Sequence, residues 1–403
     1  MKLLLVGSYL APDIPGGAEQ SAENLRTILE AAGHSIATLR WRPATAFTLG
    51  TQIAPDTTPG LTHDDWAART WRPGEPIAVL GRLAKAEFYI MEFLTRASAR
   101  DVREYIERHG IDLIIINSFR GLGYDLIDKL GRAGVPVICI LHDFALACMN
   151  KGMARKGVLC TRPCPACSLV TVLNRRSLAR IGKLALVAPS RYVLDKVAGA
   201  LQLANATRHH IPNPNSYTFI RRVRDHGNPL VLGYIGRLEV DKGVAGLLDH
   251  ADRLHAACGL RLIIAGAGSL SDAVAAFAAE RPWVDYRGQV PADQVHEVYN
   301  AIDVLTIPSL WPENFPGVAV HAMGSGLPCI GFDIGGLPEV IDHGQTGFVV
   351  PFGDFGALHD RVVELDRNRR LLADMSRASL DASARYDPAP LAERWVELVA
   401  SMA

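Results

Sequence analysis

The chain has 403 residues, too many for one ordinary hydrophobic core, and this length indicates two domains of about 200 residues each. Its 49% hydrophobic and 21% charged residues are typical of a soluble globular protein, and 42 Lys and Arg balance 42 Asp and Glu, so the overall charge does not favour nucleic acid as a partner. No apolar run is long enough to cross a bilayer and the N-terminus has no signal-peptide cleavage site, so we expect a cytoplasmic protein.

The first half of the chain alternates short β-type runs with helical patterns. The expected strands are residues 3–6, 35–39, 113–116, 137–141 and 186–188, and the expected helices are 19–32 and 101–108. Such alternation predicts a parallel sheet with helices on both faces. Residues 41–80 are rich in Pro, Thr and Trp and break the pattern, which fits either an acceptor-side loop or an ordinary surface insertion.

The second half repeats this organisation. Its expected strands are residues 230–235, 260–265, 284–287, 304–307 and 329–332, and the polar segment 221–228 is the best linker. We therefore expect an α/β protein with two doubly wound, Rossmann-like domains at 1–220 and 229–384, and a last helix over about 385–403 that packs back on the first domain. Ligands of open α/β sheets bind in the crevice that such domains form.

Two glycines follow the first expected strand. Gly16 and Gly17 open the next helix, where a backbone without side chains lets a phosphate approach the helix N–H groups. Glycine also starts helices for purely steric reasons, and the spacing is not that of dinucleotide-binding motifs.

A histidine follows the strand at 137–141. His142 lies in the sequence LHDFALAC, at a strand end that would face the crevice, where imidazole can hydrogen-bond a sugar hydroxyl. A histidine that only caps the following turn is the alternative.

Two cations follow the first strand of the second half. In GYIGRLEVDKGV, Arg237 offers a planar fork and Lys242 a point charge, a pair suited to the two phosphates of a nucleoside diphosphate. A solvated pair of surface charges is the alternative. Gly236, Gly266, Arg287 and Gln289 lie at the ends of this strand and the next two.

The stretch PSLWPENFPGVAVHAMGSGLPCIGFDIGGLPEV, residues 308–340, carries the clearest signal. Glu313 is an isolated carboxylate in a loop rich in Pro, directly after the strand at 304–307. The apolar segment 317–323 then predicts a buried helix whose first N–H groups would point at the contents of the loop, and a phosphate fits there.

Together these segments resemble the retaining glycosyltransferases of the GT-B architecture, family 4 (glycosyl transferases group 1). The resemblance implies two facing domains with the donor in the C-terminal one. It also implies that Glu313 and His142 orient the donor sugar, that Arg237 and Lys242 neutralise the leaving diphosphate, and that the loop with Gly16 and Gly17 closes over the substrates. Further donor-site positions implied by it are Gly236, Gly266, Arg287, Gln289, Asn314, Phe315, Pro316, Gly317, Val318 and His321.

The implied reaction moves a hexosyl group from a nucleotide diphosphate sugar to an acceptor hydroxyl with retention of configuration. The acceptor would be a sugar, a lipid-linked sugar or a small molecule in polysaccharide, glycolipid or glycoconjugate synthesis. No cofactor is required for catalysis, and Arg and Lys supply the cations that a divalent metal would otherwise provide. Two other functions stay open, a sugar-nucleotide epimerase or hydrolase and a non-catalytic sugar-nucleotide-binding protein.

One position departs from the family pattern. The family has two glutamates separated by seven residues, and His321 occupies the second position here. In the family that carboxylate accepts hydrogen bonds from the ribose hydroxyls, whereas a neutral imidazole has one acceptor nitrogen.

Four cysteines cluster after His142. Cys148, Cys160, Cys164 and Cys167 suit a structural zinc ion or an iron–sulfur cluster, while buried free thiols and a redox pair are the alternatives. Pro163 and Pro165 argue against a regular helix there. Two basic segments, 81–108 and 174–186, would fit either peripheral contact with the inner face of the membrane or core helices with solvated basic edges.

Overall fold

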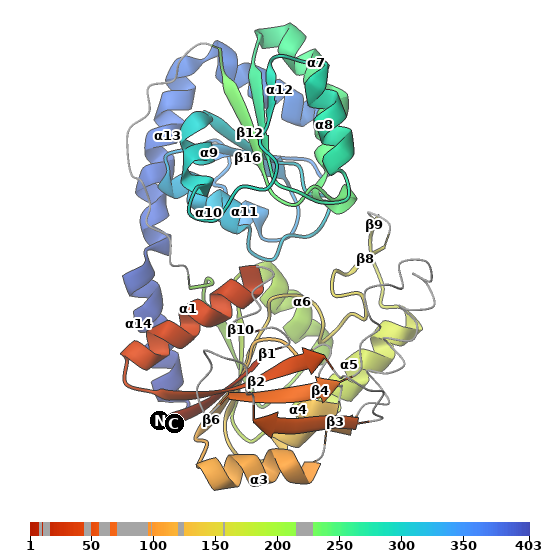
Figure 1. Ribbon diagram of the computed structural model, residues 1–403, viewed down its shortest axis with the longest axis vertical. Coiled ribbons are helices and arrows are strands. Elements are labelled where there is room, and N and C mark those ends of the chain that lie inside the picture. The colour runs from red at the N-terminus through yellow and green to blue at the C-terminus, as the bar shows by residue number, and fades with distance from the viewer. Residues whose placement is uncertain are drawn as a thin grey trace. The chain divides into compact units, whose positions relative to one another are not determined.

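The structure, a computed structural model, describes residues 1–7, 10, 17–43, 50–55, 65–70, 96–97, 99–119, 125–155, 158–214 and 229–403. The chain divides into two compact units, each built around its own sheet (Figure 1). The first unit comprises Met1–Met153, Thr161–Asn215 and Pro388–Ala403, and the second comprises Ala154–Cys160 and Ser216–Asp387. No described helix is long and apolar enough to span a membrane.

Within the described residues, the sheet of the first unit has nine strands in the order β11-β10-β7-β6-β1-β2-β4-β3-β5. The pair β3 and β4 is antiparallel and the other neighbours are parallel. The strands are β1 (Lys2–Gly7), β2 (Ser35–Pro43), β3 (Gly50–Pro55), β4 (Asp65–Thr70), β5 (Arg96–Ala97), β6 (Leu113–Ile116), β7 (Val137–Ile140), β10 (Leu184–Ala188) and β11 (Ala206–His210).

All five strands predicted for the first half are confirmed. The stretch 41–80, however, is not simply a loop, because it contains β3 and β4. Pro residues obscured this in the sequence, while the Thr, Ile and Trp residues between them favour extended backbone.

Both faces of the first sheet are buried. Along β1 the side chains alternate, so Leu3 and Leu5 lie in one hydrophobic cluster and Leu4 and Val6 in another. On the first face pack α1 (Gly17–Ala31) and α14 (Pro388–Ser401), which lie side by side (Figure 1) and contribute buried residues including Trp395. The helices on the second face are α3 (Ala99–His109), α4 (Asp125–Gly131), α5 (Pro165–Leu178) and α6 (Arg191–Leu201).

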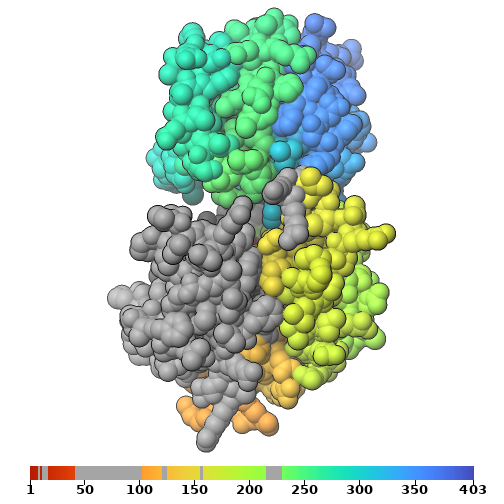
Figure 2. All heavy atoms as spheres, turned by 90° about the vertical axis from the view of Figure 1, so that its right-hand side faces the viewer, coloured from red at the N-terminus to blue at the C-terminus, as the bar shows by residue number. Residues whose placement is uncertain are grey.

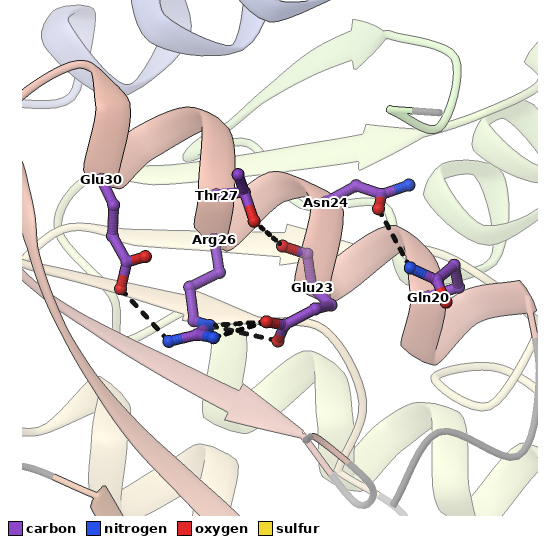
Figure 3. Close-up of polar contacts among 6 residues, drawn as sticks. All are labelled: Gln20, Glu23, Asn24, Arg26, Thr27 and Glu30. Carbon is purple, nitrogen blue, oxygen red and sulfur yellow. Dashed lines mark hydrogen bonds and ion pairs between the residues drawn. The ribbon is translucent and has the colours of Figure 1, made fainter. Parts of the chain in front are cut away.

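Helix α1 is amphipathic, which decides which of its sides packs against the sheet. Its buried side holds Leu25 and Leu29, whereas Figure 3 shows ion pairs and hydrogen bonds along its polar side. Arg26 donates to Glu23 at 2.5 Å and to Glu30 at 3.3 Å, spacings of three and four residues that stabilise a helix.

The cysteine segment contains a regular helix, so the expectation drawn from Pro163 and Pro165 is wrong. Helix α5 begins at Pro165, with Cys164 at the N-cap position. Proline is tolerated there because the first N–H group of a helix has no partner within the helix. Before it, β8 (Ala154–Arg155) and β9 (Val158–Leu159) form a short antiparallel pair.

The second unit has a parallel sheet whose described strands run in the order β14-β13-β12-β15-β16-β17. The strands are β12 (Val231–Ile235), β13 (Arg261–Ala265), β14 (Val284–Tyr286), β15 (Val304–Ile307), β16 (Cys329–Phe332) and β17 (Gly347–Val350). The five predicted strands are confirmed, and β17 is an additional one. The α-helices are α7 (Val244–Cys258), α8 (Ser271–Ala279), α9 (Val295–Ala301), α10 (Gly317–Gly324), α11 (Leu337–Val340), α12 (Phe355–Arg367) and α13 (Arg369–Ser383).

The strand order fixes where each unit can bind a ligand. In the second unit the chain goes from β12 outwards to β13 and β14, then returns to the other side of β12 for β15, β16 and β17. In the first unit β2 lies on one side of β1, and β6, β7, β10 and β11 follow on the other. Ligands of open α/β sheets bind beyond the carboxyl ends of the strands at such reversals. These points lie between β12 and β15 and between β1 and β6.

Candidate functional site

The loop after β12 carries two cations. Arg237 is exposed at the strand end, and Lys242 ends a short 3-10 turn, Val240–Lys242, just before α7. Gly243 between them and the helix has φ +72°, and a Cβ atom there would lie 1.8 Å from the Pro308 carbonyl oxygen. Glycine at 243 therefore lets the β12 loop pack against the β15 loop.

The loop after β15 brings a carboxylate to Lys242. The Lys242 Nζ atom lies 2.6 Å from Glu313 Oε1, and the two side chains are 20% and 16% exposed. The backbone reinforces the junction, because the Leu310 N–H donates to the Asp241 carbonyl at 2.8 Å. The two predicted residues thus meet at the strand-order reversal of the second unit.

The loop after β16 contacts the backbone of Glu313. The Gly336 N–H donates to the Glu313 carbonyl at 2.5 Å. Gly335 has φ +63°, and a Cβ atom at this position would lie 2.3 Å from that same carbonyl oxygen. Position 335 in GGLPE therefore requires glycine, because the backbones of the two loops touch there.

Helix α10 begins at the end of the loop after β15, four residues beyond Glu313, without a side-chain cap. Pro316 occupies the N-cap position and makes no capping hydrogen bond. The first turn of an uncapped helix has a partial positive charge and N–H donors that suit an anion. The predicted stretch from Asn314 to Val318 forms this helix start. The Phe315 ring, however, packs edge-on against Tyr386, with the ring centroids 5.8 Å apart.

A cavity of about 170 Å³ opens beside Arg237. Its wall includes the predicted residues Gly236, Arg237, Gly266 and Gln289, together with apolar residues of α9. Gly266 must be glycine because a Cβ atom there would lie 1.8 Å from the Gly236 carbonyl oxygen. Arg287 does not line this cavity, and its guanidinium pairs with Asp285 at 2.9 Å.

His321, which stands where the family pattern has its second glutamate, packs against an aromatic ring. Its imidazole stacks on Tyr299 with the planes 5° apart and the centroids 5.6 Å apart. Burial lowers the pKa of His321 to about 3, so the side chain is neutral at physiological pH. It cannot supply the negative charge of the glutamate that the family pattern has there.

The first unit has a second cluster of polar groups at its own strand-order reversal. His142, two residues after the end of β7, places Nε2 2.7 Å from Oδ1 of Asn117, which directly follows β6. Asn117 also donates through Nδ2 to the Ala18 carbonyl in the first turn of α1, at 3.4 Å. Sequence reasoning missed Asn117, although its position directly after a strand was a usable signal.

These contacts set the chemistry of His142. Burial lowers its pKa to about 4, so the ring is neutral near pH 7. Since the Asn117 amide nitrogen faces Ala18, the amide oxygen accepts from Nε2–H and leaves Nδ1 as the acceptor nitrogen of the ring. Both residues line a cavity of about 100 Å³ together with Glu19, Asp143 and Lys151.

Of the two glycines predicted at the start of α1, the structure describes only Gly17. Gly17 opens the helix, and a Cβ atom there would meet nothing within 4 Å, so sterics alone do not require glycine. Gly16 lies outside the described residues, and so does most of the basic segment 81–108.

Three of the four predicted metal ligands lie near the start of α5. Cys167 Sγ is 3.9 Å from Cys148 Sγ, and Cys167 also hydrogen-bonds with Cys164. Cys160 is exposed and lies in the segment that groups with the second unit. In the described part of the chain no three His, Cys, Asp or Glu side chains form a group that could hold a metal ion. The zinc or iron–sulfur centre stays a prediction.

The second unit matches a known family. The model of the Glycosyl transferases group 1 family matches residues 229–368. A 2-deoxystreptamine N-acetyl-D-glucosaminyltransferase of Streptomyces fradiae is 30% identical over 62% of this chain and 61% of its own length. A phosphatidyl-myo-inositol mannosyltransferase of Mycobacterium leprae is 23% identical over 93% of this chain and 90% of its own.

Solved structures share the fold of the whole chain. HepE of Anabaena, crystallised with UDP, superposes with a TM-score of 0.67 at 19% identity, and the match covers 100% of both chains. The same protein is also known in complex with UDP-glucose. The chain spans about three fifths of the length of the Streptomyces relative.

Proposed function

Because residues 229–368 match the model of the Glycosyl transferases group 1 family and the chain has the two-domain GT-B fold, we propose that this protein is a glycosyltransferase that uses a nucleotide diphosphate sugar. The contact of 2.6 Å between Lys242 and Glu313 carries the proposal. It places a cation suited to a diphosphate beside a carboxylate suited to sugar hydroxyls, at the strand-order reversal where α/β sheets bind ligands.

In the proposed reaction the second unit holds the donor. Arg237 and Lys242 offset the negative charge that grows on the diphosphate as the glycosidic bond breaks, and the uncapped start of α10 adds N–H donors. Glu313 accepts hydrogen bonds from sugar hydroxyls. His142 of the first unit, neutral near pH 7, acts on the same reaction as a hydrogen-bonding group for a sugar hydroxyl.

The donor we propose is a UDP-hexose. UDP and UDP-glucose occupy the structural neighbour HepE, and the cavity beside Arg237 and Gln289 would take the base. The resemblance to retaining enzymes supports retention of the anomeric configuration. The acceptor would be the hydroxyl of a sugar, a lipid-linked sugar or a small molecule.

The test is a panel of UDP- and GDP-sugars with sugar and lipid-linked acceptors, followed by UDP or GDP release and by NMR of the product. We expect an acceptor-dependent release and a product whose anomeric configuration equals that of the donor. Arg237→Ala should weaken UDP binding by about 10- to 150-fold, because a charge-assisted hydrogen bond contributes about 1.5–3 kcal/mol.

Arg253→Ala is the matched control, because Arg253 is an exposed arginine on α7 that does not line the cavity. Donor turnover that needs no acceptor would instead identify a hydrolase or epimerase. Nucleotide binding without turnover of any donor would identify a non-catalytic sugar-nucleotide-binding protein.

A further inference from the structure

Two cysteines of the first unit are in contact and have no role in the proposed reaction. Cys148 Sγ and Cys167 Sγ are 3.9 Å apart, and the Met149 N–H donates to Cys167 Sγ at 3.5 Å. Cys148 is only 4% exposed, whereas Cys167 is half-buried. One thiol is therefore open to a small reagent, and its neighbour is shielded from solvent.

This contact belongs to a row that joins α5 to the loop after β7. Thr171 Oγ1 lies 2.8 Å from the Cys167 carbonyl of its own helix and 3.3 Å from the Ala147 carbonyl of the loop, so its one proton is shared between these two acceptors. Asn174 Nδ2 donates to the Leu146 carbonyl at 2.9 Å. Cys167, Thr171 and Asn174 are spaced by four and three residues and so share one face of the helix. Figure 2 shows the α5 segment, in yellow, at the surface of the molecule.

The geometry favours a bond between the two sulfurs over a shared metal ion. A disulfide needs the sulfurs to close from 3.9 Å to about 2.05 Å, and their contact shows that the two side chains already point at each other. A tetrahedral metal site needs four ligands. The described residues provide no group of three suitable side chains, and Cys160 is exposed in a segment that groups with the second unit.

We propose that Cys148 and Cys167 form a reversible disulfide that fastens the loop carrying His142 to α5. A hydroperoxide ROOH oxidises the Cys167 thiol to a sulfenic acid and leaves as the alcohol ROH. The Cys148 sulfur then attacks the Cys167 sulfur, the S–S bond forms, and the sulfenic hydroxyl leaves as water with the Cys148 proton. A dithiol reductant restores both thiols and becomes a disulfide itself.

The full-length protein, treated with hydrogen peroxide and then denatured, tests this directly. We expect the number of titratable thiols to fall from seven to five, and to return to seven after dithiothreitol. Peptide mapping should join the peptides of Cys148 and Cys167. The reaction should take hours rather than minutes, because burial raises the pKa of Cys167 to about 11 and leaves little thiolate.

Cys148→Ser and Cys167→Ser should each abolish the linkage, and Cys258→Ser should leave it intact. Linkage between Cys164 and Cys167, or seven thiols after peroxide, would overturn the proposal. So would one tightly held zinc ion per chain that keeps the thiols from reacting. These readouts do not use transferase activity, so they stay decisive if the proposed function is wrong.

Discussion

At the scale of single residues, the central feature is that Lys242 and Glu313 neutralise each other before any donor is bound. Their charged atoms are 2.6 Å apart and both side chains are mostly buried, so water screens the pair less than it would a surface salt bridge. A diphosphate that recruits Lys242 must therefore compete with Glu313 for it. In the proposed reaction, donor binding would therefore require a rearrangement of the two charges.

Glu313→Gln should consequently have opposite effects on UDP affinity and on turnover. Removing the negative charge frees Lys242, so we expect UDP to bind about five-fold more tightly, which corresponds to about 1 kcal/mol. Turnover should fall strongly, because a neutral amide holds sugar hydroxyls less well than a carboxylate. Calorimetric titration with UDP and steady-state kinetics check both, and a parallel loss in both would move Glu313 to a structural role.

Asn117 sets the orientation and the tautomer of His142, so its substitutions should act through the imidazole. In Asn117→Asp a carboxylate faces Nε2 and raises the pKa of His142 from about 4 towards neutrality. As pH falls through that raised pKa, Nδ1 becomes protonated and stops accepting hydrogen bonds. We expect turnover of this variant to drop between pH 7 and 5, while the native protein keeps its rate over this range.

Asn117→Ala is the comparison, because it removes the hydrogen bond without adding a charge. It should lower turnover about equally from pH 5 to 8, since the tautomer is no longer held. Glu19, Asp143 and Lys151 line the same cavity and are present in both variants, so their titration cancels. Nitrogen-15 shifts of His142 in the two variants measure the tautomer and the pKa directly. Identical pH profiles would rule out Asn117 as the positioning residue.

At the scale of elements, the glycines of the β16 loop are a second determinant of the site. Gly335 combines φ +63° with a close approach to the Glu313 backbone. Gly335→Ala therefore adds the cost of a left-handed conformation, about 1–2 kcal/mol, to a steric clash that pushes Glu313 away. We expect a large loss of turnover.

Gly344→Ala separates the two costs, because Gly344 has φ +78° but nothing within 4 Å of an added Cβ atom. Gly344→Ala should lower stability by the cost of the left-handed conformation alone, about 1–2 kcal/mol, and leave the reaction rate intact. Denaturant unfolding of the two variants measures their stability, and steady-state kinetics with the donor measure their turnover. Equal rates would mean that the loop absorbs the clash without moving the carboxylate.

The elements also show what local sequence could and could not predict. Buried parallel strands such as β6 and β15 are continuous apolar runs, and all ten predicted strands are present. Residues near their ends, His142, Arg237 and Glu313, could be proposed from the sequence because open α/β sheets bind ligands beyond the carboxyl ends of their strands. By contrast, Asn117 matters through a bond to a residue 25 positions away, and the stacking of His321 on Tyr299 joins α10 to α9. Tertiary contacts of this kind leave no local pattern.

At the scale of the whole molecule, the first unit depends on the last residues of the chain. Trp395 of α14 is 1% exposed and packs in the same cluster as Leu3, Leu5 and Leu25. The second unit has a separate hydrophobic core that none of these residues joins. The two cores should therefore respond separately to substitutions and to ligands.

Scanning calorimetry of the full chain should show this as two transitions. Trp395→Ala leaves a large cavity, at a cost of about 3–5 kcal/mol, and should lower only the transition of the first unit. UDP at 100 times its dissociation constant stabilises by about 2.7 kcal/mol and should raise only the other transition, since Arg237 and Lys242 belong to the second unit. Glu397→Ala, an exposed position on α14, is the control and should shift neither. A single transition moved by both Trp395→Ala and UDP would mean that the two cores unfold as one cooperative body.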